Sequence, residues 1–178
     1  MEIELLAAGF GGQGVMAIGQ LIAASGVEEN HFALFFPSYG PAMRGGTANC
    51  VAITSDQPIG SPVLASHQNV MVMNLPSFDK FEPAVQANGC LFINSSLVDK
   101  KTTRTDIKTY YIPSNEIALE AGSNLAANIV MLGAYLKITN FAKKETVENI
   151  IRSKFEKKGE KIIEINLKAL QAGFDYVS

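Results

Sequence analysis

The feature that most limits the fold of this chain is a group of four glycines near its N-terminus. The segment Gly9-Phe10-Gly11-Gly12-Gln13-Gly14 lies between an apolar stretch, residues 2–8, and a stretch, residues 15–25, whose apolar side chains recur on one helical face. Glycine is needed where a backbone dihedral turns positive or where backbone must approach a ligand. The pattern predicts a buried central strand, a tight turn and a helix, an arrangement with which many open α/β sheets begin.

The remainder of the chain alternates between short apolar segments and amphipathic ones. We predict further strands at 31–36, 47–54, 69–73, 90–94 and 107–112, and helices at 76–87, 113–121, after Ser123, at 146–155 and in the tail beyond 166. Such alternation is typical of α/β proteins. It predicts a single α/β domain over residues 1–178, with a Rossmann-like, mostly parallel sheet and helices on both faces.

Three local signals set element boundaries within this plan. Gly26 is expected to end the first helix, and Asn88-Gly89 to form a turn before the fifth strand. Ser123 is expected to cap a long helix. The buried face of that helix is predicted from four apolar residues at helical spacing: Leu125, Ile129, Leu132 and Leu136.

Composition excludes several classes of protein. The chain has 178 residues, of which 47% are hydrophobic, so general disorder is excluded. Its formal net charge of −2 is too balanced for a protein that mainly grips nucleic acid. Two cysteines, Cys50 and Cys90, cannot supply four ligands to a cluster or structural zinc, and we expect no metal site. With no apolar run long enough for a membrane, the chain is expected to be cytoplasmic.

Charge is distributed unevenly along the chain. Residues 1–97 contain two basic residues, Arg44 and Lys80, and seven acidic ones, whereas residues 98–178 contain the other thirteen basic residues and ten acidic ones. Because interface cores are depleted in charged residues, the first half is predicted to cover part of its surface with another chain. The alternative is that this half is buried within its own fold.

The first glycine segment allows more than one function. The turn precedes a helix whose N-terminal N–H groups suit an anion such as phosphate or carboxylate. Gly9, Gly11 and Gly14 complete a G-x-G-x-x-G pattern, but no acidic residue ends the second strand, about 20 residues on, as a dinucleotide site requires. A stand-alone dinucleotide-binding oxidoreductase is therefore the less favoured alternative, and glycines that serve only close packing are another.

A second glycine-rich segment, residues 39–47, contains the isolated base Arg44. A guanidinium beside Gly45-Gly46 is suited to bidentate binding of a carboxylate or phosphate, although a structural or intersubunit ion pair is equally consistent with it. The predicted ligand-binding residues are drawn from both segments: Gly9, Gly11, Gly12, Gln13, Gly14, Tyr39, Arg44, Gly45, Gly46 and Thr47.

The two segments together resemble the gamma subunit of 2-oxoacid:ferredoxin oxidoreductases. The resemblance rests on Gly-Gly-Gln-Gly-Val-Met at 11–16 and Tyr-Gly-Pro-x-Met-Arg-Gly-Gly-Thr-Ala-Asn at 39–49, and it continues at 59–62, 124–133 and 166–173. Within the family the pattern is more similar to the 2-oxoglutarate and branched-chain subgroup than to the pyruvate type. One departure is Ala42, where the resemblance leads us to expect Glu, so the role of that carboxylate is lost here or taken by another group.

The resemblance implies a subunit that is not catalytic alone. The complex would use thiamine diphosphate with Mg²⁺ and iron–sulfur clusters on companion alpha and beta subunits, and often a small ferredoxin-like delta subunit. It would convert 2-oxoglutarate to succinyl-CoA and reduce ferredoxin; the branched-chain 2-oxoacid and pyruvate types of the same family are the alternatives. This chain would contribute architecture and a share in binding coenzyme A; a pure assembly module is the alternative.

Other polar residues are assigned structural roles. His31 and His67 are expected to be surface or hydrogen-bonded histidines, and Cys50 and Cys90 buried inert thiols. Asn124 and Asn128 are expected to cap or bridge helices in preference to contacting a ligand.

Overall fold

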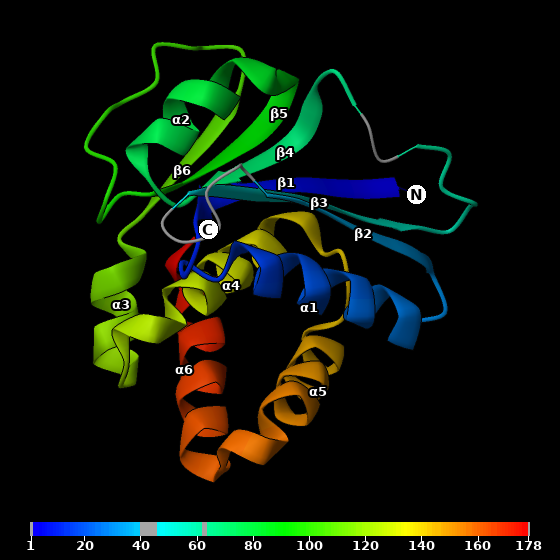
Figure 1. The fold of residues 1–178 in the computed structure, drawn as a ribbon, viewed down its shortest axis with the longest axis vertical. Helices are drawn as coiled ribbons and strands as arrows, with labels where there is room; N and C mark the ends of the chain where they lie inside the picture. The colour runs from blue at the N-terminus through cyan, green and yellow to red at the C-terminus, as the bar shows by residue number, and fades with distance from the viewer. Residues whose placement is uncertain (1, 40–45, 62–63, 178) are drawn as a thin grey trace.

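The backbone forms one six-stranded sheet with helices on both faces (Figure 1). The computed structural model describes residues 2–39, 46–61 and 64–177. The strand order is β2-β3-β1-β4-β5-β6; β3 runs antiparallel to β1 and β2, whereas β1, β4, β5 and β6 are mutually parallel. The predicted α/β fold with a mostly parallel sheet is confirmed. The strands are β1 (Glu2–Phe10), β2 (Phe32–Tyr39), β3 (Thr47–Ser55), β4 (His67–Val72), β5 (Val85–Asn94) and β6 (Lys108–Ile112).

Strand β1 is buried on both faces because its neighbours β3 and β4 flank it and apolar layers cover it above and below. Leu5 and Ala7 belong to one hydrophobic cluster, and Leu6 and Ala8 to a second cluster on the opposite face. A strand that is apolar without alternation is expected at such a position. The sequence-based prediction of a central first strand is therefore confirmed.

The helices divide unequally between the two faces. Helix α2 packs on one face through Phe78, whereas α1 and α4 cover the other; α6 packs on α4, and α5 packs against α1 and α6 (Figure 1). The helices are α1 (Val15–Glu28), α2 (Leu75–Phe81), α3 (Ser114–Ala121), α4 (Ala127–Thr139), α5 (Lys144–Phe155) and α6 (Glu160–Tyr176), with short 3₁₀ turns η1 (Glu82–Ala84), η2 (Asn124–Ala126) and η3 (Glu156–Lys158).

Helices α4 and α6 cross in direct backbone contact. A Cβ at Gly133 would overlap the carbonyl oxygen of Leu170, and a Cβ at Gly173 would overlap the carbonyl oxygen of Val130. Each helix therefore presents a glycine to the backbone of the other. Helix α4 is buried almost throughout, so this crossing holds it between the sheet and α6.

Three predicted boundaries are wrong. Gly26 lies inside α1, which continues to Glu28 because its last turn packs over β2 and β3. The helix predicted at 76–87 ends at Phe81, since η1 and the buried Val85 turn the chain into β5; Asn88-Gly89 thus lies within the strand, with Asn88 at φ 65°.

The predicted apolar face of the long helix is also wrong at one position. Ser123 caps η2, its Oγ accepting from Leu125 N at 3.3 Å, and α4 begins only at Ala127. Leu125 is consequently 90% exposed, whereas Ile129 and Leu132 are buried as predicted.

The glycine crossing generates a prediction about stability. We expect Gly173→Ala to lower the free energy of unfolding by about 3 kcal/mol or more, because overpacking against a backbone carbonyl cannot be relieved by a side-chain rotation. Urea unfolding measures the change. Gly60→Ala is the matched control, since a Cβ there meets nothing within 4 Å. Equal stability of the two variants would contradict the close crossing.

Candidate functional site

The sheet has a topological switch point between β1 and β4. From β1 the chain passes to β2 and β3 on one side, and β4, β5 and β6 follow on the other. In open α/β sheets, ligands bind outside the carboxyl ends of the strands at such a point. Here the segments that follow β1, β4 and β5 meet, and they bring the first glycine segment beside residues 73–74 and 94–97.

The side-chain amide of Gln13 joins two of these segments. Its Oε1 accepts hydrogen bonds from Phe10 N at 2.7 Å and from Asn74 Nδ2 at 2.8 Å, and its Nε2 donates to Met73 O at 3.2 Å. Asn74 in turn caps α2, its Oδ1 accepting from Ser77 N at 2.9 Å. The turn after β1 is thus fixed to the turn after β4.

A chain of asparagines continues the polar surface across the end of β5. Asn94 is fully buried, and its Nδ2 donates to Asn115 Oδ1 at 2.8 Å. Asn115 Nδ2 then donates to Asn124 Oδ1 at 2.8 Å. Asn128 Nδ2 donates to Gly14 O at 3.3 Å and so connects the start of α4 with the start of α1.

These amides line a pocket of about 150 Å³. None of its described lining residues is charged, and Leu97 and Leu125 add exposed apolar side chains. Such a pocket suits an uncharged fragment that offers both hydrogen-bond donors and acceptors. The lining residues come from five segments: Gly12, Gln13, Met73, Asn94, Leu97, Asn115, Asn124, Leu125, Ala127 and Asn128.

The predicted binding residues are only partly brought together here. Gly12 and Gln13 line the pocket, whereas Gly9 lies in β1 and Gly14 occupies the N-cap position of α1 with φ 77°. A side chain at Gly14 would overlap Asn128 as well as strain the backbone. These four residues share one turn but do not all face one cavity.

The second glycine segment approaches the first along the antiparallel pair β1–β3. Gly11 N donates to Gly46 O at 3.1 Å, so this amide already has a partner within the chain. Thr47 opens β3 opposite Phe10, and Tyr39 closes β2. Arg44 and Gly45, the other two predicted residues of this segment, lie outside the residues that the structure describes.

Sequence reasoning missed several residues of the site. Asn94 ends the fifth strand and lines the pocket, and Asn74 follows the fourth strand and is hydrogen bonded to Gln13. These positions were a usable signal, because ligands bind at the carboxyl ends of parallel strands. Asn115, Leu97 and Met73 carried no comparable signal. Asn124 and Asn128, assigned to capping or bridging helices, make such contacts and also line the pocket.

The two cysteines and a buried histidine are structural. Burial raises the pKa of the Cys50 thiol to about 12, and its Sγ donates to Val15 O at 3.3 Å. Burial also raises the pKa of the half-buried Cys90. His67 is buried and its Nδ1 is hydrogen bonded to Glu4 Oε1; Glu4 Oε2 also accepts from Gln68 N at 3.0 Å.

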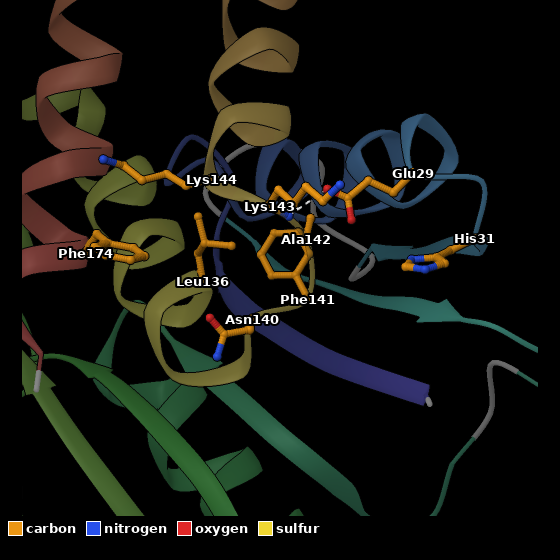
Figure 2. A pocket seen from close by; sticks show the side chains of 9 residues that line it. All are labelled: Glu29, His31, Leu136, Asn140, Phe141, Ala142, Lys143, Lys144 and Phe174. Atoms are coloured by element: carbon orange, nitrogen blue, oxygen red, sulfur yellow. Dashed lines mark hydrogen bonds between the residues drawn. The ribbon is translucent and has the colours of Figure 1, made fainter.

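A second pocket, of about 310 Å³, lies where α1, α4, α5 and α6 converge (Figure 2). Glu29 contacts the start of α5 there, accepting hydrogen bonds from Lys143 N and Thr146 Oγ1, both at 2.7 Å. Burial acts to raise the pKa of Glu29, but these two hydrogen bonds and the Lys143 charge outweigh it, and the pKa lies below its usual value. Glu29 is therefore engaged in contacts that join the end of α1 to the start of α5. The amide-lined pocket is the better candidate site.

Two features are absent from residues 2–39, 46–61 and 64–177. No helix in these ranges combines the length and the apolar character that crossing a membrane requires. Nor do three His, Cys, Asp or Glu side chains gather there as metal ligands would.

The Gln13 contacts predict the effect of a nearly isosteric change. Gln13→Glu retains the acceptor for Phe10 N and Asn74 but sets a carboxylate oxygen against the carbonyl of Met73. We expect the free energy of unfolding to fall by about 1–3 kcal/mol at pH 7, and by less at pH 5, where a protonated carboxyl can donate. Unfolding curves at both pH values measure this. The exposed Gln57→Glu is the control, and a loss independent of pH would contradict the contact with Met73.

The lowered pKa of Glu29 predicts a pH-dependent contribution to stability. Because the pKa is lower in the folded state than in the unfolded state, ionised Glu29 stabilises the fold above the unfolded pKa, and this contribution is lost as the pH falls through the folded pKa. Glu29→Gln should lower the free energy of unfolding by about 0.5–1 kcal/mol at pH 7 and by progressively less below about pH 4. The exposed Glu28→Gln, in the same turn, should have no such effect; equal losses in both variants would refute the assignment.

Comparisons with known proteins match the chain along its length. Residues 4–176 match the family described as pyruvate ferredoxin/flavodoxin oxidoreductase. The chain is 36% identical over 177 residues to ketoisovalerate oxidoreductase subunit VorA of Methanothermobacter marburgensis, which covers 98% of this chain and 36% of that protein. It is 33% identical over 178 residues to 2-oxoglutarate synthase subunit KorC of Methanocaldococcus jannaschii, covering 98% of this chain and 94% of that subunit.

A solved structure agrees with the fold. The keto/oxoacid ferredoxin oxidoreductase gamma subunit of Geobacter sulfurreducens superposes with a TM-score of 0.86 at 29% identity, covering 98% of this chain and 95% of that one. The chain thus spans about a third of VorA but nearly the whole of KorC and of this gamma subunit. These relatives are subunits of oxidoreductases, and the chain belongs to the pyruvate ferredoxin/flavodoxin oxidoreductase family.

Proposed function

We propose that residues 1–178 form the gamma subunit of a 2-oxoacid:ferredoxin oxidoreductase that converts 2-oxoglutarate to succinyl-CoA and reduces ferredoxin. The observation that carries this proposal is the match to KorC, which extends over 94% of that subunit. Ketoisovalerate, a branched-chain 2-oxoacid, is the second candidate substrate, because VorA is the more identical of the two relatives, at 36%. The reaction would take place in the cytoplasm.

The reaction chemistry itself belongs to companion chains in this proposal. Both cysteines lie at β-strand positions, and Cys50 is buried with a strongly raised thiol pKa, so they do not suit a cluster. Alpha and beta subunits, with a small ferredoxin-like delta subunit, would carry thiamine diphosphate, Mg²⁺ and the iron–sulfur clusters. The gamma chain would provide architecture and help to bind coenzyme A.

The described residues fit part of a coenzyme A molecule. The pocket of about 150 Å³ is smaller than a whole-ligand site, and its amides match an uncharged group with donors and acceptors. Coenzyme A has such groups in its adenine and in its pantetheine amides, and its thiol accepts the acyl group. Its phosphates require cations, which the pocket lining lacks; Arg44, predicted from the sequence, would supply one.

Affinity purification of the chain from its native cytoplasm, kept anaerobic, tests the subunit role. The co-purifying chains are identified by mass, and the eluate is assayed for 2-oxoacid- and coenzyme A-dependent reduction of a viologen dye. Companions with thiamine and cluster motifs, together with activity highest on 2-oxoglutarate, support the proposal. Higher activity on 3-methyl-2-oxobutanoate would favour the second candidate, and recovery of the chain alone without activity would refute both.

The coenzyme A contribution predicts a specific kinetic change. In the assembled complex, Arg44→Ala should raise the apparent KM for coenzyme A about tenfold, equivalent to about 1.4 kcal/mol, and leave the KM for the 2-oxoacid unchanged. Arg152→Ala is the control, since Arg152 lies on α5 and makes only a long ion pair of 3.8 Å with Glu160. If Arg44→Ala only dissociates the subunits, or leaves the KM for coenzyme A unchanged in the intact complex, the binding role of Arg44 is refuted.

A further inference from the structure

The second pocket, where α1, α4, α5 and α6 converge, takes no part in the proposed reaction. Its volume of about 310 Å³ lies within the range of about 300–1,000 Å³ that is usual for small-molecule sites. Helix α1 begins beside the amide-lined pocket and ends at the second pocket, and its 14 residues span about 20 Å. The two pockets share no described lining residue. The second pocket is therefore a separate cavity, which we call the helix-junction pocket.

The helix-junction pocket has aromatic walls that the fold already holds in place (Figure 2). Phe141 is buried, and its ring stacks on the ring of buried Tyr135 with centroids 5.3 Å apart. The half-buried ring of Phe174 is contacted by two ammonium groups, Lys137 Nζ at 5.0 Å and Lys144 Nζ at 5.4 Å from its centroid. Because these walls are formed before a ligand arrives, little further ordering opposes the entry of an apolar group.

The charged side chains leave this pocket with a net positive charge. Lys143 and Lys144 line it together with one acid, Glu29. With His31 neutral, the formal sum of two lysines and one glutamate is +1. Lys144 Nζ lies 3.5 Å from Glu148 Oε1, whereas the ammonium group of Lys143 makes no ion pair with a described residue. The backbone N–H of Lys143 donates to Glu29, so this lysine is fixed at the pocket with its charge available.

Three polar side chains at the pocket have no hydrogen-bond partner among the described residues: His31, Asn140 and Lys143. Asn140 ends α4 in the left-handed conformation, with φ 50°, and its backbone N–H donates to Leu136 O at 2.9 Å. The backbone of this turn is thus fixed, while the side-chain amide is free to donate. An ammonium group, an amide N–H and an imidazole N–H are all donors, and a carboxylate accepts from such groups with both of its oxygens.

We propose that the helix-junction pocket binds a small monocarboxylate with an apolar, ring-bearing body. Lys143 Nζ and Asn140 Nδ2 donate to the carboxylate, and the ring packs against Phe141 and Phe174. A cavity of about 310 Å³ holds about ten non-hydrogen atoms, at the roughly 30 Å³ that a water molecule occupies in the liquid. A dianion is less suited, because its second charge would meet the Glu29 carboxylate. The inference rests on the lining residues alone and does not depend on the proposed function.

Titration of the isotope-labelled full chain with 3-phenylpropanoate, followed by NMR, tests the ligand class. We expect saturable shifts at the end of α4, the start of α5 and Phe174, with a Kd of about 1 mM or below. The amide 3-phenylpropanamide lacks the charge and acetate lacks the ring, so each should bind at least about tenfold more weakly. Equal affinity for the acid and its amide, or shifts that do not saturate, would overturn the proposal.

Two substitutions test the donors without disturbing the aromatic walls. Asn140→Gly keeps the left-handed turn, which glycine adopts readily, and removes only the amide. Lys143→Gln removes the charge but keeps the backbone N–H that donates to Glu29. Each should raise the Kd for 3-phenylpropanoate about threefold to fivefold, whereas Lys157→Gln, at an exposed position in η3, should leave it unchanged. Urea unfolding curves confirm that the variants are folded, and unchanged affinity in both Asn140→Gly and Lys143→Gln would refute the assignment.

Calorimetric titration of the assembled complex extends the test to the protein with its companions. The preference for 3-phenylpropanoate over its amide should be the same there as in the chain alone. Loss of binding in the complex would show that a companion chain fills the pocket, and this would overturn the ligand role. Recovery of the chain without companions would refute the proposed function, but it would not alter the binding measured on the chain alone.

Discussion

The side-chain amide of Gln13 is the contact on which the arrangement of the candidate site depends. It satisfies the backbone N–H of Phe10, accepts from Asn74 and donates to the carbonyl of Met73. A carboxylate could not donate and an aliphatic side chain could do neither, so only an amide holds both turns at once. Through Asn74 the same contact sets the start of α2, and the helix packs Phe78 onto the sheet. The position of the turn after β1, the capping of α2 and the burial of Phe78 therefore depend on one another.

The sequence predicted the elements well where periodicity and burial agree. Residues 2–8, 47–54 and 107–112 became strands because their apolar side chains meet a layer on each face. It failed where tertiary contacts override local signals. Gly26 is a helix-ending residue by local preference, but it lies where α1 approaches Thr54 too closely for a side chain, and the helix continues past it. Leu125 fits a helical spacing but belongs to a 3₁₀ turn and is exposed.

Only part of the candidate site could be predicted from the sequence, for a related reason. Glycines that serve a turn can be recognised within one segment of the sequence. The asparagines that line the pocket instead come from the end of β5 and from the starts of α3, η2 and α4, which only the fold brings together. The bond from Asn94 to Asn115 and the bond from Asn115 to Asn124 also depend on which way each amide is turned. A pocket lined by amides, with no charged side chain among its described residues, suits a neutral group, in keeping with the proposal that companion chains would carry the reaction chemistry.

The two halves of the chain differ in how many charged residues they place on the surface. Residues 98–178 contain thirteen of the fifteen basic residues, eight of them between Lys143 and Lys168, so the surface of this half can be solvated without a partner. Residues 1–97 build the sheet margin, where β2 has backbone groups to satisfy on one side and two half-exposed rings to cover. An uncharged margin of this kind suits contact with another chain, because charged residues are depleted at the cores of interfaces.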